Sequence, residues 1–111
     1  MFRVALFSFG LLLTAAVQAD GDHKHEFAAD IKVFHDVLAP LWHAPAGPER
    51  IKGICNAVSD LETKATAIVS SNSESLRKSV VGLKHACASA DADRIAGQFS
   101  AVHDEFHRLI D

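Results

Sequence analysis

The chain has 111 residues, with 14 acidic and 11 Lys or Arg side chains, and its formal net charge at pH 7 is −3. This length suits one small domain, and the mildly acidic balance without a basic cluster argues against nucleic acid as a partner. Seven histidines, no Tyr and one Met, at position 1, leave His, Cys and carboxylate groups as the available metal ligands.

The first 19 residues have the pattern of a secretory signal peptide. Arg3 gives a basic start, residues 4–13 are almost wholly apolar, and small residues follow up to Ala19. The apolar run is too short to span a bilayer, so we expect cleavage after Ala19 and export to a bacterial periplasm or beyond. Loss of Arg3 would change the net charge from −3 to −4. We expect no membrane insertion of the mature chain.

Residues 20–25 are predicted to be a flexible tail that contains His23 and His25, and residues 26–111 to be the folded part. The tail could be merely solvated or could bind metal weakly. Cleavage one residue later would instead expose Gly21-Asp22-His23, a tripeptide that suits square-planar Cu²⁺ or Ni²⁺.

Four stretches of the folded part carry apolar residues at intervals of three and four, which is the stripe of an amphipathic helix. They run over residues 27–41, 51–68, 76–87 and 95–109, and strand-type alternation is missing. Short breaks rich in Pro, Gly, Ser or Asp separate them. Because short loops make consecutive helices antiparallel neighbours, the sequence predicts an all-α, up-down-up-down antiparallel four-helix bundle.

Two positions predict local features of these helices. Pro40 should kink the first helix or end its regular part near Ala39. Ser73, followed by Glu74, suits the N-cap of the third helix.

The two cysteines are predicted to join the second and third helices. Cys55 lies 17 residues before Asn72, at the turn between these helices, and Cys87 lies 15 residues after it. The two positions therefore come level in an antiparallel hairpin, and an oxidising compartment would favour a disulfide. The alternative is a pair of thiolates that bind metal.

The remaining histidines predict a ligand cluster at one end of the bundle. His103 and His107 stand four residues apart, so their rings share one helix face. The start of the first helix, with His35, should face the end of the last helix, and the tail histidines should emerge nearby. Imidazoles arranged in this way suit Zn²⁺, Cu²⁺ or Ni²⁺. The alternative is that these histidines are only partly buried polar residues at the core edge.

His43 and His85 are expected at the opposite end, near the disulfide. There we interpret them as side chains that cap the C-terminal ends of the first and third helices. A second metal site at that end is an alternative.

The organisation resembles small periplasmic cytochromes of the four-helix type, both the b-type cytochrome and cytochrome c-prime. Phe106-His107, four positions before Asp111, is similar to the b-type arrangement, in which an axial haem His follows an aromatic residue in the last helix. The resemblance implies non-covalent haem b held by His107, with His35 in place of the family's axial Met. Absence of Cys-x-x-Cys-His excludes covalent attachment.

Three functions follow as hypotheses. The first is a periplasmic metal-binding protein that acts as carrier, buffer or sensor for a divalent or copper ion, with His35, His103 and His107 as ligands and the tail histidines assisting. The second is a non-covalent b-type haem electron carrier. The third is a non-catalytic interaction module that binds a periplasmic protein through Trp42 and residues 45–48. We do not expect an enzyme, because the chain lacks a nucleophile–base arrangement, a phosphate loop and paired inward carboxylates.

Overall fold

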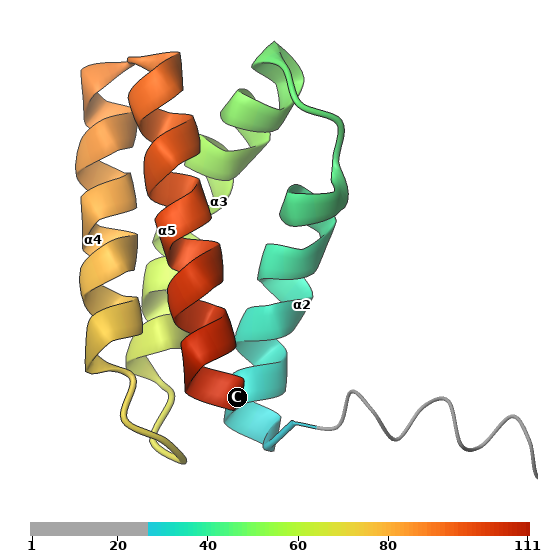
Figure 1. The fold of residues 1–111 in the computed structure, drawn as a ribbon, viewed down its shortest axis with the longest axis vertical. Helices are drawn as coiled ribbons and strands as arrows, with labels where there is room; N and C mark the ends of the chain where they lie inside the picture. The colour runs from blue at the N-terminus through green and yellow to red at the C-terminus, as the bar shows by residue number, and fades with distance from the viewer. Residues whose placement is uncertain (1–26) are drawn as a thin grey trace, which may run out of the picture.

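A computed structural model of the chain describes residues 27–111, which form four consecutive α-helices (Figure 1). The predicted signal peptide and the tail with His23 and His25 lie outside the described residues. The predicted all-α, up-down-up-down bundle is confirmed, with no strand in the part described. The helices are α2 (Ala29–His43), α3 (Pro48–Thr66), α4 (Glu74–Ser89) and α5 (Ala92–Ile110).

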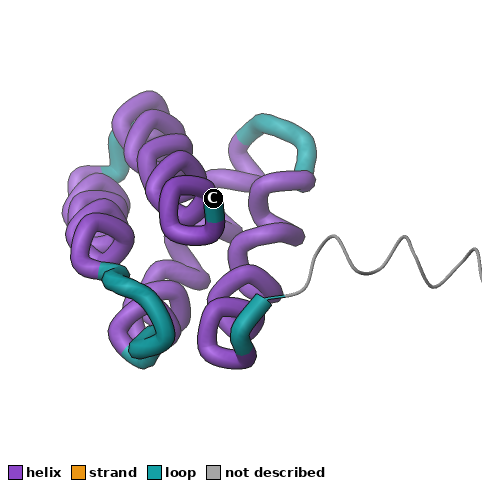
Figure 2. The backbone as a smooth tube through the Cα atoms, turned by 60° about the horizontal axis from the view of Figure 1, so that its bottom comes forward, coloured by secondary structure: helices purple, strands orange, loops and turns teal. Residues whose placement is uncertain are grey.

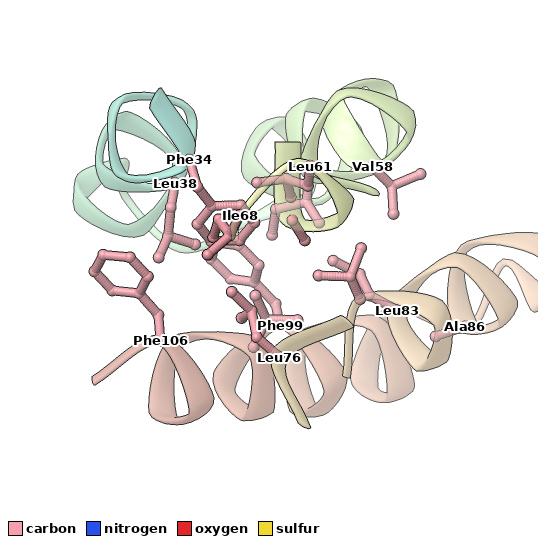
Figure 3. Packing of buried hydrophobic residues seen from close by; sticks show 14 of the residues in the cluster. Phe34, Leu38, Val58, Leu61, Ile68, Leu76, Leu83, Ala86, Phe99 and Phe106 are labelled. Carbon is pink, nitrogen blue, oxygen red and sulfur yellow. The ribbon is translucent and has the colours of Figure 1, made fainter. Parts of the chain in front are cut away.

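Figure 2 shows the four helices joined by short loops, and one cluster of buried apolar side chains lies between them. Each helix contributes the stripe that its sequence spacing predicts. Phe106 of α5 reaches toward Phe34 and Leu38 of α2 (Figure 3), and its ring stacks on that of Phe34 with centroids 5.6 Å apart. The largest fully buried side chains are Phe34, Phe99, Ile54, Leu61, Leu76, Leu83, Val80 and Val102.

The helix boundaries follow from local chemistry, with two departures from expectation. Pro48 occupies the first turn of α3, and the Asp91 carboxylate accepts hydrogen bonds from the amides of Asp93 and Arg94 at the start of α5. The expectation that Pro40 could end the first helix near Ala39 is wrong, because α2 continues to His43. Pro40 and Asp36, whose carbonyl loses its helical donor, are both exposed, so water can satisfy that carbonyl.

Ser73 stands at the N-cap of α4, as expected, but its hydroxyl does not cap that helix. It is buried and donates toward the carbonyl of Ile68, 3.4 Å away, at the end of the preceding segment. The Asn72 side chain accepts from the Glu74 amide instead. The Ser73 hydroxyl also donates toward the Ala65 carbonyl in the last turn of α3, 3.5 Å away, so Ser73 serves the C-terminal end of α3 and the α3–α4 connection rather than the N-terminus of α4.

The predicted disulfide is confirmed. Cys55 of α3 and Cys87 of α4 are bonded, with their Cα atoms 5.6 Å apart and a sequence separation of 32. The alternative of free thiolate ligands is thereby excluded, since no cysteine in residues 27–111 is free.

The α2–α5 seam is looser than the other seams. The backbones of α4 and α5, of α3 and α4, and of α2 and α3 pack closely, whereas α2 and α5 diverge toward the end of α2 (Figure 1). Aromatic side chains bridge this seam, including Phe34 against Phe106 and Trp42 against Phe99. None of the four helices has both the length and the apolar composition needed to cross a bilayer.

Candidate functional site

A cleft of about 320 Å³ lies in the α2–α5 seam, and we call it the histidine cleft. Its polar side chains are four imidazoles and the indole of Trp42, and aromatic and aliphatic groups make up the rest. The lining residues are Phe27, His35, Leu38, Ala39, Trp42, His43, His103, Phe106, His107 and Ile110.

His103 and His107 form the closest pair of imidazoles, as their spacing predicts. Their ring centroids are 4.5 Å apart, one turn apart on α5. The His103 ring also stacks face to face on Trp42, with centroids 3.6 Å apart and planes 8° apart. The stack fixes the orientation of one imidazole against α2, while His107 remains exposed.

The surroundings of His103 favour its neutral form. Burial lowers the pKa of His103 from 6.5, the neighbouring His107 and His43 lower it further, and the Asp104 carboxylate acts in the opposite direction. Its Nδ1 atom is buried and has no hydrogen-bond partner, since Oδ1 of Asp104 is 3.6 Å away. A neutral imidazole with an unpartnered ring nitrogen is the form that binds metal.

His35 lines the same cleft as the α5 pair, and Phe106 packs near both His35 and His107. The Phe106 ring lies 5.9 Å from His35 and 6.2 Å from His107, between centroids. The Phe27 ring packs against both His35 and Phe106, with centroids 5.0 Å and 6.0 Å away, and Nδ1 of His35 lies 3.2 Å from the Asp36 carboxylate. The predicted convergence is therefore partial, because His35 reaches the cleft without reaching the other two rings.

His43, which the sequence places at the opposite end as a cap of the first helix, also lines the histidine cleft. It lies in the last turn of α2, as expected, and beside His103 in that cleft. In a helix, side chains lean toward the N-terminus. Because α2 and α5 are antiparallel, Trp42 and His43 lean toward His103, and His103 leans toward them.

The other residues that the sequence brings into question are His85, two carboxylates of α5 and Trp42. His85 is exposed on α4 and lies before its last turn, so it does not cap that helix; the Ala90 amide closes the helix end instead. Asp104 is exposed, and Glu105 pairs with Arg108. Trp42, which the interaction hypothesis needs at the surface, is partly buried between His103 and Phe99.

The described part of the chain contains no group of three or more His, Cys, Asp or Glu side chains placed to hold a metal ion together. Within residues 27–111, the donor set is therefore a pair of imidazoles with two more in the same cleft. His23 and His25, also predicted as ligands, lie outside the described residues, four and two positions before Phe27.

The four-helix architecture is compatible with that of the small periplasmic cytochromes. Comparison of the chain with known protein families, with curated proteins and with solved structures finds no match.

Proposed function

We propose that the protein is a periplasmic metal-binding four-helix bundle that acts as a carrier, buffer or sensor for a copper or divalent ion. The observation that carries this proposal is the His103–His107 pair, two imidazoles 4.5 Å apart in a cleft that holds two further histidines. Imidazole is a good ligand for Cu²⁺, Zn²⁺ and Ni²⁺. Helical i,i+4 spacing lets both rings approach one ion with little change of backbone.

Further ligands of the ion would be the histidines that lie close enough to reach it. His43 is near enough to His103 to affect its titration, so a rotamer change of this exposed side chain is the shortest route to a third ligand. His25 is two residues before Phe27, whose ring lines the cleft, and two residues span at most about 7 Å. An ion held by two fixed ligands and exchangeable ones suits transfer or buffering better than permanent structural binding.

Calorimetric titration of chelator-treated, untagged protein with Cu²⁺, Zn²⁺ and Ni²⁺ tests this proposal. We expect the double variant His103→Ala/His107→Ala to lose binding and His85→Ala, an exposed histidine outside the cleft, to retain it. His43→Ala and His23→Ala/His25→Ala then identify the additional ligand. Affinity should fall as the pH drops through the histidine range, because protons compete for the rings. Unchanged binding in the His103/His107 double variant would reject the site.

Trp42 supplies a second readout. It is the only Trp of the chain and stacks directly on His103. A paramagnetic Cu²⁺ ion on His103 should quench its fluorescence strongly, and Zn²⁺, which has no unpaired electron, should quench it less. Equal behaviour of the two ions would place the copper elsewhere.

Non-covalent haem b is the second candidate, favoured by the aromatic lining of the cleft and by His35 and His107 in that lining. The test is a haem absorption band in protein from the exporting host or after addition of hemin. Absence of any such band would remove this candidate.

A further inference from the structure

A second cleft, of about 400 Å³, lies where the end of α2 and the start of α3 face the first half of α5. Trp42, Ile51, Ile54 and Phe99 provide most of its apolar wall. Among residues 27–111, Arg50 is the only charged side chain that lines it, so we call it the Arg50 cleft. Its size lies within the range of small-molecule sites, and an apolar wall with one charged group is their usual composition.

The guanidinium of Arg50 is held in place by aromatic rings instead of by a carboxylate. Its central carbon lies 5.3 Å from the centroid of Trp42 and 5.4 Å from that of Phe99. The ion pairs of Lys and Arg side chains in residues 27–111 do not include Arg50. An oriented, partly buried guanidinium without an anionic partner has unused donors for a planar anion.

The start of α3 adds to the positive potential of the same cleft. Gly47 is the N-cap residue, no side chain caps the helix, and Pro48 follows in the first turn. The amides of Glu49 and Arg50 therefore have no acceptor within the helix. The carboxylate of Glu49 does not line the Arg50 cleft but a neighbouring one.

We propose that the Arg50 cleft binds a small organic carboxylate with an apolar body. The carboxylate pairs with the Arg50 guanidinium, and the apolar body lies against Trp42, Ile51 and Phe99. Charge complementarity selects an acid over a neutral or cationic molecule, and the apolar wall selects it over a small inorganic anion. This site is separate from the histidine pair, and its existence does not depend on metal binding.

The test is titration of chelator-treated full chain with phenylacetate and hexanoate, followed by calorimetry and by Trp42 fluorescence. 2-Phenylethanol is the neutral comparison, and acetate is the comparison without an apolar body. We expect both acids to bind, and 2-phenylethanol and acetate to bind at least about tenfold more weakly, since a hydrogen-bonded charged pair and the apolar contact each contribute at least that factor.

Three variants locate the site. Arg50→Gln should weaken phenylacetate binding by about tenfold or more, whereas Lys52→Gln, an exposed change on the same helix outside this cleft, should leave it unchanged. Ala96→Leu fills the cleft from an exposed position of α5 and should abolish binding without disturbing the core. Circular dichroism checks that each variant is folded. The proposal is overturned if neither acid binds, if 2-phenylethanol or acetate binds as well as phenylacetate, or if Arg50→Gln behaves like Lys52→Gln.

Discussion

The Cys55–Cys87 bond should contribute a large part of the stability of this domain. It closes a loop across a sequence separation of 32, for which chain entropy gives a stabilisation of about 4 kcal/mol at 25 °C. Domains of this size unfold with a free energy of roughly 5–15 kcal/mol in total. The double variant Cys55→Ala/Cys87→Ala should therefore unfold at much lower urea concentration, with a melting temperature lower by about 15–30 °C.

Urea unfolding followed by far-ultraviolet circular dichroism measures both the stability and the mechanism. If the bond acts by restricting the unfolded chain, the variant's unfolded state expands, so the slope of free energy against urea should increase. The unaltered chain with its disulfide reduced is the control and should match the variant. A loss below about 1 kcal/mol with an unchanged slope would contradict the chain-entropy reasoning.

Three further predictions concern substitutions at single positions. The Asp30 carboxylate accepts hydrogen bonds from the Ser70 hydroxyl and from the amides of Val69 and Ser70, which lower its pKa from 3.8 to about 2. Its contribution is therefore present above pH 3.8 and is lost as the pH falls through about 2, so Asp30→Asn should lower the urea midpoint much more at pH 7 than at pH 2. An equal difference at both pH values would contradict this. Phe106→Ala should destabilise the fold by about 3–5 kcal/mol in the same assay, because its ring is only 2% exposed, and a loss under 1 kcal/mol would contradict the packing described. Gly97→Ala should raise the free energy of unfolding by roughly 0.5–1 kcal/mol, since a Cβ there meets no atom within 4 Å, whereas Gly47→Ala should lower it because Gly47 has a φ of 144°; the opposite order would refute this.

Much of the fold could be predicted because its determinants are local in sequence. The three-and-four spacing identifies the buried face of each helix, and Ile54, Leu83 and Phe99 all lie within the core that the spacing predicts. The disulfide could be predicted by counting residues from each cysteine to the turn, because the short α3–α4 connection determines which residues of the two helices lie side by side. The role of Ser73 could not, since its hydroxyl serves the preceding connection and not the helix that it begins.

The site was predicted less completely, because it depends on the axial offset and separation of two helices that are not consecutive. The four-residue spacing predicts that His103 and His107 lie together, and the antiparallel order of the helices predicts that His35 lies near them; the structure has the pair 4.5 Å apart and His35 in the same cleft. The spacing could not predict that Phe106 would pack near both His35 and His107, or that Trp42 would stack on His103. One signal in the sequence could have indicated the second contact. Helical side chains lean toward the N-terminus of their helix, and this direction brings the side chains at the end of α2 toward His103.

The position of the disulfide also determines how the molecule should open. A covalent bond joins α3 to α4, and α5 packs closely on α4, whereas α2 is held without any cross-link, through α3, the Asp30 hydrogen bonds and the aromatic seam. We therefore expect the amide protons of α2 to exchange with solvent through partial opening, whereas those of the other three helices exchange only on global unfolding. Partial opening of α2 would expose the histidine cleft and the Arg50 cleft together, so a ligand could bind or dissociate while α3, α4 and α5 stay folded.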